Sequence, residues 1–435
     1  MNRFRIPHCH TLMALGLAAA LTACSGNESA DPHQTGANPQ LPDKQAPLVP
    51  SMGIAKPTTW QEVVPTAPQG FKARAIATGL GIPRQILVLP NGDLLIAEGR
   101  GGHAPKMRPK DFIAGSLKAK GNTSVKSGNR LTLLRDVNGD GSFRQQTVFA
   151  DNLDAPYGMA LVGNTLYVAN QGELVSFAYT PGQTKAAGKP RHVADLPSVI
   201  NHHWTKSLAA SPDGKFLYVG IGSNSNIMER GPMAEQDRAT VWQIDVATGA
   251  HRQFVHGIRN PTALAVHPET GVVFAVVNER DELGPNLVPD YLTSLREGAN
   301  YGWPYSYWGQ NVDTRVHPQK PEVVATAIKP DYSLGSHVAA LGLAFSNAAV
   351  GGPFTNGVFI GEHGSWNRDR PAGYKVVFVP FANGMPAGEP VDFATGFHDP
   401  KSGLTRGRPV GVAVDAKGAV YVADDLANTI WRISR

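Results

Sequence analysis

Histidine and arginine stand just ahead of several apolar, strand-like segments of this 435-residue sequence, where they could move protons and bind anions. Asn201-His202-His203-Trp204 precedes one segment, and an imidazole there suits removal of a proton from a substrate hydroxyl. Arg259-Asn260-Pro261 and Arg406-Gly407-Arg408 precede two others, and guanidinium groups bind carboxylates through paired hydrogen bonds. These residue types predict a site with a general base and a cationic lining.

Each of these groups also has a structural interpretation. Two adjacent histidines can serve as hydrogen-bonding groups alone, and the arginines can form salt bridges with Asp or Glu at sheet edges. Residue type leaves both interpretations open.

The stretch from Asn278 to Pro304 is rich in oxygen-bearing side chains and turn residues, which a hard cation such as Ca²⁺ requires. A polar loop without metal is the alternative. A second stretch, Asp136-Val-Asn-Gly-Asp-Gly141, resembles the start of an EF-hand loop, but Thr147 stands where that loop needs Glu. We interpret it as a turn.

An internal repeat supplies the elements that would position these residues. Each copy is an apolar strand, a turn rich in Gly, Asp or Asn, and a second apolar strand. The copies span Ile86–Glu98, Gly158–Asn170, Ser207–Val219, Thr262–Phe274 and Gly411–Ala423, with a degenerate copy from Gly342 to Gly361. Six copies at about 60 residues each fit four-stranded blades. We therefore predict an all-β fold, a six-bladed β-propeller over residues 67–435, with the site at the mouth of its axial channel.

The first 23 residues predict a lipoprotein signal peptide. Arg3 and Arg5 precede an apolar run from Leu12 to Leu21 that is too short to span a bilayer. Leu21-Thr22-Ala23-Cys24 resembles a lipobox, so we expect cleavage before Cys24 and lipidation of its sulfur. Ordinary cleavage beside an incidental cysteine is the alternative.

Ser25 after this cysteine favours the outer membrane, so we expect an anchored protein on the periplasmic side of the envelope. The composition of residues 24–66, rich in Pro, Ala, Gln and Asn, predicts a flexible tether.

Composition narrows the classes of partner. The formal net charge of +5 is modest and not clustered, which argues against nucleic acid. Cys9 and Cys24 are the two cysteines of the sequence, so the predicted mature domain has no thiol for a disulfide or a thiolate metal site.

Six motifs together resemble the sorbosone dehydrogenase group, which is akin to the soluble quinoprotein glucose dehydrogenases. The resemblance runs in order over about residues 67 to 435. The motifs are His202-His203 before Ser-Pro-Asp-Gly, Gly257-Ile-Arg-Asn-Pro261, Asn278-Glu-Arg-Asp281, Asn300-Tyr-Gly-Trp-Pro304, Gly361-Glu-His-Gly-Ser-Trp-Asn-Arg368 and Gly407-Arg-Pro-Val-Gly-Val412.

This resemblance implies roles for single residues. His203 falls on the family's catalytic base, and His202 takes the place of a carboxylate. A family glutamine is replaced by Pro156-Tyr157, and a family lysine has no counterpart, so His363 and Arg368 would stand in for it. The implied ligands of pyrroloquinoline quinone (PQQ) are Arg230, Arg259, Asn260, His363, Arg368, Arg406 and Arg408.

The resemblance also implies Ca²⁺. The catalytic ion would lie at Gly284-Pro285 or at the carbonyls of Arg280 and Asp281, and a second ion near Asp290 and Tyr301.

The implied activity is PQQ-dependent oxidation of an aldose or a sorbosone-like aldehyde to a lactone or acid, with electrons passing to a quinone or cytochrome. Two other functions stay open: a binding or scaffold propeller without catalysis, and a calcium-dependent lactonase.

Overall fold

The computed structural model describes residues 32–45, 52–102, 104–106, 112, 115–116 and 119–435. These residues are mostly strands and turns, with a short α-helix, α2 (Pro321–Val324), helical residues at 112, 115–116 and 119–120, and three 3₁₀ turns, η1 (Pro32–Gln34), η2 (Pro232–Glu235) and η3 (Gly352–Phe354). The fold is therefore all-β.

Most strands of the described residues belong to six sheets of four or five strands. In chain order we call them sheets 1 to 6. Sheet 1 contains β4 (Pro83–Val88), β5 (Leu94–Glu98), β6 (Arg130–Arg135) and β7 (Gln145–Ala150); sheet 2 contains β8 (Gly158–Val162), β9 (Thr165–Ala169), β10 (Glu173–Ala178) and β11 (Arg191–Asp195); sheet 3 contains β12 (Lys206–Ala210), β13 (Phe216–Ile221), β14 (Thr240–Asp245) and β15 (His251–His256).

The later sheets recruit strands from distant parts of the chain. Sheet 4 contains β16 (Pro261–Val266), β17 (Val273–Val277), β18 (Pro289–Ser294), β21 (Tyr332–Ser336) and β1 (Thr35–Gly36); sheet 5 contains β22 (Ala340–Phe345), β23 (Gly357–Glu362), β24 (Lys375–Ala382), β25 (Met385–Pro386) and β26 (Val391–Ala394); sheet 6 contains β29 (Pro409–Val414), β30 (Val420–Asp424), β31 (Thr429–Ser434) and β3 (Lys72–Ala77). Two small sheets pair β19 (Ser306–Tyr307) with β20 (Asn311–Val312), and β2 (Lys56–Pro57) and β27 (His398–Asp399) with β28 (Leu404–Thr405).

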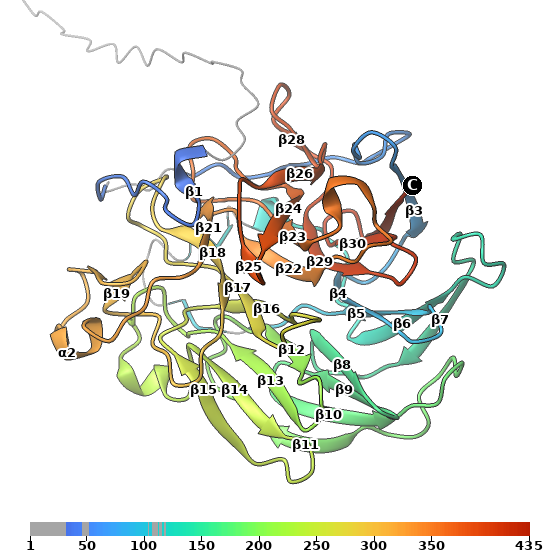
Figure 1. Ribbon diagram of the computed structural model, residues 1–435, viewed down its shortest axis with the longest axis horizontal. Coiled ribbons are helices and arrows are strands. Elements are labelled where there is room, and N and C mark those ends of the chain that lie inside the picture. The colour runs from blue at the N-terminus through green and yellow to red at the C-terminus, as the bar shows by residue number, and fades with distance from the viewer. Residues whose placement is uncertain (1–31, 46–51, 103, 107–111, 113–114, 117–118) are drawn as a thin grey trace, which may run out of the picture.

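The first strands of the six sheets contact one another in sequence, and β29 of sheet 6 returns to β4 of sheet 1. Figure 1 shows the sheets around a common centre, with β3 from the N-terminal part beside the C-terminal strands. β3 pairs antiparallel with β31, in the register Ala73 to Ile433, so the two ends of the domain share one sheet. This pairing leaves fewer exposed sheet edges. The arrangement is propeller-like.

The predicted repeats coincide with the first hairpin of each sheet. The antiparallel pairs β4–β5, β8–β9, β12–β13, β16–β17, β22–β23 and β29–β30 fall on the six copies, which confirms them as hairpins. Turn glycines such as Gly92 and Gly214 have φ of 88° and 69°, which side chains rarely adopt. The apolar residues of the hairpins are buried between neighbouring sheets, as where Leu95 of sheet 1 packs with Val168 of sheet 2.

The described part of the N-terminal segment lies against the sheets. β1 pairs antiparallel with β21, and Thr35 donates a hydrogen bond to Glu389 at 2.9 Å. Trp60 is 8% exposed, and its Nε1 donates to Asp424 Oδ2 at 3.1 Å. This differs from the flexible tether expected over residues 24–66. Backbone pairing and single anchors hold the segment, and neither produces the apolar periodicity by which packed segments are recognised in a sequence.

Residues 1–31 lie outside the described residues, so the predicted signal peptide and the lipidation site at Cys24 do too. Within the described residues, no helix has the length and apolar character needed to cross a membrane.

Candidate active site

His203 lies in the loop between β11 and β12, and one of its ring nitrogens is fixed. His203 Nδ1 is 2.7 Å from the carbonyl oxygen of Ser223 and 3.0 Å from the Ser223 hydroxyl. That hydroxyl donates its own proton to the carbonyl of Ser225 at 2.7 Å. Both Ser223 atoms must therefore accept, so Nδ1 carries the proton of the neutral ring. Nε2 is left as the atom that can take up a proton.

The surroundings of His203 favour its neutral form. Burial lowers the pKa of His203 well below its usual range, and the charges of Arg259, His202 and Arg238 lower it further, against the opposing effect of the Ser223 hydrogen bond. A neutral imidazole with a free Nε2 is the form that a general base needs.

Asn260 flanks the same position as His203. A side chain at Gly222 would collide with both the amide oxygen of Asn260 and the Cβ of His203, so these two side chains meet above Gly222. The Asn260 oxygen is buried and has no hydrogen-bond partner among the described residues. An orphaned polar atom beside a base is a feature expected of a ligand site.

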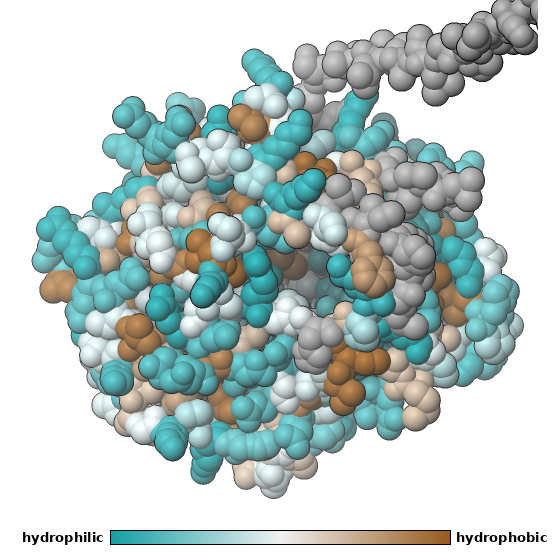
Figure 2. Space-filling model, turned by 180° about the vertical axis from the view of Figure 1, so that it is seen from behind, coloured by the Kyte–Doolittle hydropathy of each residue, from teal (hydrophilic) through white to brown (hydrophobic). Residues whose placement is uncertain are grey.

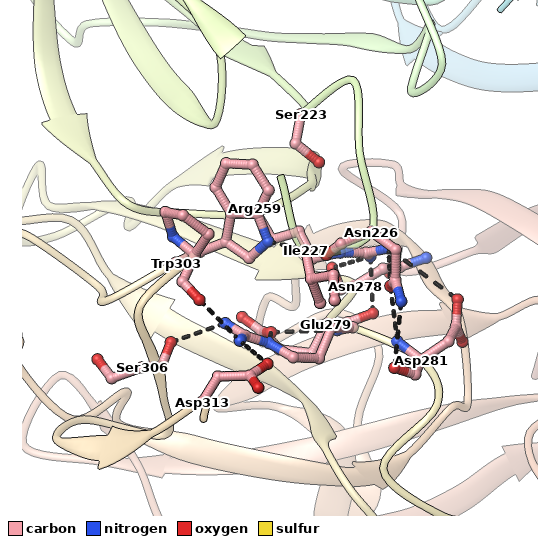
Figure 3. A network of polar contacts seen from close by, with 12 residues as sticks. Ser223, Asn226, Ile227, Arg259, Asn278, Glu279, Asp281, Trp303, Ser306 and Asp313 are labelled. Carbon is pink, nitrogen blue, oxygen red and sulfur yellow. Dashed lines mark hydrogen bonds and ion pairs between the residues drawn. The ribbon is translucent and has the colours of Figure 1, made fainter. Parts of the chain in front are cut away.

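Arg259 is held by protein groups on all sides (Figure 3). Its guanidinium donates to the main-chain oxygens of Asn226, Asn278 and Glu279 at 3.2, 3.1 and 2.7 Å, and to the side chain of Asn226 at 3.0 Å. Asp281 lies 4.0 Å away. Arg259 therefore orders these loops, and its charge reaches His203 through a low-dielectric interior.

A second cluster surrounds Asp425 at the end of β30. Asp425 pairs with Arg84 and lies 2.9 Å from His363 Nε2. Arg408 donates to the carbonyls of His363 and Gly364, both at 3.0 Å. Burial would raise the pKa of Asp425, but His363 and the two arginines outweigh it and hold that pKa well below its usual range.

Arg84 links this cluster to the His203 loop. Its guanidinium lies over the rings of Trp204 and Tyr157, 5.5 and 5.7 Å from their centroids, while it pairs with Asp425. Arg84 is the second residue of β4, at the start of the first strand of sheet 1, and His203 lies shortly before β12, the first strand of sheet 3. The sequence signal that would have included Arg84 is this place at the start of a repeat. Asp425 and Ser223 follow strands and carry no comparable signal.

The other predicted cofactor residues lie apart from these two clusters or have protein partners. Arg368 donates to the carbonyl of Ser336 at 3.2 Å, and Arg230 to that of Pro105 at 2.7 Å. Arg406 lies 4.0 Å from Asp399 of β27, so it does not share partners with Arg408. The two arginines of the expected pair therefore point to different parts of the structure: Arg408 contacts the loop that carries His363, whereas Arg406 faces Asp399.

Arg408 is suited to an anionic ligand. It donates to two carbonyls and to Asn122, and no carboxylate of the described residues lies within ion-pairing distance of it. A guanidinium held by neutral acceptors retains its charge for a ligand carboxylate. Together with the orphaned oxygen of Asn260, this arrangement fits an anionic, hydrogen-bonding cofactor such as PQQ.

Asp290, Tyr301 and Gly284, three of the predicted Ca²⁺ residues, direct their oxygens to protein partners. Both carboxylate oxygens of Asp290 accept main-chain amides, from Glu279 and Ala339 at 2.8 Å each, and burial raises its pKa to about 7. Tyr301 donates to Ser294 at 2.5 Å, and the Gly284 carbonyl meets His337 Nε2 at 3.1 Å.

Of the two carbonyls predicted for the catalytic ion, that of Asp281 accepts hydrogen bonds from Asn226 Nδ2 at 3.2 Å and Arg315 at 3.4 Å. The side chain of Arg280 is fully buried and pairs with Asp313 at 2.6 Å, while that of Asp281 faces His337 at 3.5 Å. Pro285 lies in a turn with Asn286. Within the described residues, no three acidic, histidine or cysteine side chains converge as a metal site. These side chains do not fit a Ca²⁺ ion, and no chemical step below is assigned to one.

The fold and the two clusters define a propeller-like protein with a histidine and several cations at one site. One face of it shows hydrophilic side chains with scattered apolar ones around a central hollow (Figure 2). The family model described as TrAA12-like matches residues 65–290 and 314–435. The chain therefore belongs to the TrAA12-like family. Tyr301 lies in the stretch that this model does not match.

Curated relatives include the PQQ-dependent pyranose dehydrogenase of Coprinopsis cinerea, 23% identical over 428 residues, which covers 84% of this chain and 54% of that protein. A Borreliella burgdorferi protein of no described function is 31% identical over 222 residues, half of this chain and 56% of its own length. The chain thus spans about half the length of these relatives.

Solved structures show the same fold. The PQQ domain of the Coprinopsis cinerea enzyme superposes with a TM-score of 0.69 at 20% identity, covering 86% of this chain and 97% of that domain. The PQQ-bound aldose sugar dehydrogenase of Streptomyces coelicolor gives 0.55 at 16% identity, covering 85% and 99%.

Proposed function

We propose that this protein is a PQQ-dependent dehydrogenase that oxidises an aldose or a sorbosone-like sugar aldehyde to the lactone or acid, on a six-bladed propeller. The observation that carries this proposal is the fixed tautomer of His203, which leaves Nε2 as a proton acceptor beside the orphaned oxygen of Asn260. The relatives named above support the choice of cofactor.

Arg408 and Asn260 would hold the cofactor, with Arg84 and Asp425 fixing the loop around them. PQQ, when bound, supplies a quinone that accepts hydride from the substrate carbon. His203 Nε2 takes the proton of the hydroxyl on that carbon, which for an aldehyde substrate is a hydroxyl of its hydrate, so the substrate loses one hydride and one proton and gains a C=O double bond. The Ser223 carbonyl stabilises the resulting imidazolium through Nδ1–H.

We further propose that the protein is exported and anchored through Cys24 on the periplasmic side of the envelope, at the outer membrane. A quinone or cytochrome would then reoxidise the cofactor. Ca²⁺ is proposed only from the family resemblance, because the predicted side-chain ligands point elsewhere.

Two other functions predict different results. A scaffold propeller predicts no PQQ binding. A calcium-dependent lactonase needs carboxylates converging on one metal, an arrangement that the described part of the chain lacks.

The test is a titration of the purified protein with PQQ, with and without Ca²⁺, followed by dye reduction with aldoses, sorbosone and simple aldehydes. Saturable PQQ binding with sugar-dependent dye reduction is the expected result. Absence of PQQ binding under both conditions would overturn the proposal. Wild-type affinity in an Arg408→Met variant would exclude Arg408 as a ligand.

A further inference from the structure

Arg238 lies behind the loop that carries His203 and bridges it to the segment that carries the Ser223 acceptor. Arg238 is 6% exposed. One terminal nitrogen donates to the His203 carbonyl at 2.8 Å, and Nε donates to the Gly222 carbonyl at 2.7 Å. The other terminal nitrogen donates to Pro197 at 2.7 Å. Because Gly222 precedes Ser223, one planar group joins the base to its hydrogen-bond acceptor.

Lys206, the first residue of β12, also holds the loop that carries His203. It is fully buried, and Nζ donates to the Trp204 carbonyl and to Asn201 Oδ1, both at 3.0 Å. Asn201 Oδ1 also lies 3.4 Å from both terminal nitrogens of Arg238. Two buried basic side chains thus fix residues 201 to 204 through neutral oxygens, and burial, together with the charge of Arg238, lowers the pKa of Lys206 well below its usual range.

This arrangement is unusual for buried cations. Neither Arg238 nor Lys206 has a carboxylate within ion-pairing distance in the described part of the chain. Glu235 is the carboxylate whose charge opposes the lowering of the Arg238 pKa, and it is itself bound to the Ser225 hydroxyl and to the Asn224 main-chain amide. Burying unpaired charge is costly, and the pKa of Arg238 falls to about 10 mainly through burial. A neutral side chain would hold a loop at lower cost.

We propose that Arg238 is a positioning residue for His203, acting through the main-chain carbonyls of His203 and Gly222. It keeps His203 Nδ1 against the Ser223 carbonyl, so that Nε2 remains the atom that receives the substrate proton. The inference rests on the proposed function for the identity of that substrate. The placement of His203 Nδ1 by Arg238 does not depend on that function, because it involves protein groups alone.

Several charged groups face His203 and must enter any account of its titration. Arg259 approaches from the loop before β16, His202 from the β11–β12 loop that also carries His203, and Arg238 from just before β14. Lys206 and Glu235 are further titratable groups that act on or lie beside Arg238. Removing Arg238 deletes one repelling charge and frees the loop. Both changes should move the pKa of His203 upward, toward its ordinary value.

The test is nitrogen-15 NMR of the histidine side chains in the full-length protein without PQQ. The His203 signals are assigned by their loss in His203→Gln. In the wild type we expect the Nδ1–H tautomer and no protonation near pH 6.5, the ordinary value for histidine. In Arg238→Met we expect mixed tautomers and a titration closer to that value. Arg252→Met, on exposed β15 of the same sheet, should leave both unchanged.

A second variant keeps the inference testable if Arg238→Met does not fold. Arg238→Lys retains the charge but cannot span the His203 and Gly222 carbonyls together, so the Nδ1–H population should fall while the pKa of His203 stays low. An unchanged tautomer in Arg238→Lys, or in a folded Arg238→Met, would overturn the inference.

Kinetics separate this inference from the proposed function. In reconstituted enzyme, Arg238→Met should lower kcat roughly 10- to 100-fold, because misplacement of a reacting group by about 1 Å costs that much. PQQ affinity should stay within about twofold of wild type, since Arg238 does not touch the cofactor residues. Absence of dye reduction in the wild type would overturn the proposed function, whereas the NMR result decides the positioning role independently.

Discussion

His203 and His363 lie at the two ends of the site and are held in opposite ways. His203 donates from Nδ1 to a neutral carbonyl, with buried cations behind it. His363 donates from Nε2 to the Asp425 carboxylate, which Arg84 also contacts. The difference shows that an adjacent carboxylate does not by itself define the base. His363 has its Nε2 occupied, while His203 keeps the same nitrogen available.

Both imidazoles are neutral, for related reasons. Burial is the first cause of the lowered pKa in each, and it lowers that of His363 to about 4. For His363, Arg408 adds to burial, and the Asp425 carboxylate only partly opposes them. We therefore assign proton transfer to His203 and a structural role to His363, and the following predictions test that division.

The largest expected effect is that of His203→Gln. Loss of the base should reduce kcat roughly 1,000-fold, within the range of general-base contributions, with PQQ affinity nearly unchanged. Steady-state dye reduction with the reconstituted enzyme measures it. His202→Gln is the matched control, because it removes the adjacent, exposed imidazole. If His202→Gln were the more damaging change, the assigned base would be the wrong histidine.

The next effect concerns the arginines. Arg408→Met should weaken PQQ binding by about 10- to 100-fold, as expected when a half-buried charge partner of a carboxylate is lost. Arg406→Met should change it less than about threefold, because Arg406 faces Asp399. Fluorescence titration with PQQ compares the two. Equal losses would mean that both arginines reach the cofactor, as the sequence motif predicted.

Glu362, which precedes His363, gives a prediction on stability. Burial, only partly opposed by Lys375, raises the pKa of Glu362 to about 8, and its Oε2 has no hydrogen-bond partner among the described residues. Between the ordinary pKa of a glutamate and about pH 8, Glu362 is therefore protonated in the folded state and ionised in the unfolded state. Stability from this group is present at low pH and is lost as pH rises toward 8.

Glu362→Gln should therefore raise the free energy of unfolding at pH 8.5 by about 2–4 kcal/mol relative to the wild type, so that the variant unfolds at a higher denaturant concentration. At pH 4.5 the two proteins should differ little. Urea unfolding at both pH values measures this. A stabilisation that is the same at both pH values would show that the effect comes from packing and not from ionisation.

Sequence patterns predicted the hairpins well, because alternation and turn chemistry are local signals. They also selected His203 and Arg408 as candidates, because these residues stand at repeated positions ahead of inner strands. They missed the features that arise when distant segments meet: Ser223 under His203, Asp425 between Arg84 and His363, and Arg238 across two loops. The predicted Ca²⁺ ligands illustrate the converse. Asp290 and Tyr301 carry side-chain oxygens that could bind a cation, but in the fold Asp290 accepts a main-chain amide and Tyr301 donates to a main-chain carbonyl.

The N-terminal segment shows the same limit and carries the smallest predicted effect. Asp424 accepts the amide of Arg408 at 2.9 Å and the indole N–H groups of Trp60 and Trp431 at 3.1 and 3.2 Å. Burial raises the pKa of Asp424 to about 6, and these donors oppose that rise. Trp60 thus helps a buried carboxylate hold the backbone of Arg408.

Trp60→Phe keeps the aromatic packing against Phe397 and Trp431 and removes one donor. It should cost about 1–2 kcal/mol of stability at pH 8, where the Asp424 carboxylate is charged, and less at pH 5, where it is protonated. PQQ affinity should fall about threefold. Trp242→Phe is the control, because the Trp242 indole N–H has no partner among the described residues. Equal, pH-independent losses in both variants would mean that Trp60 contributes packing alone, and that the side of the site around Arg408 does not depend on the N-terminal segment.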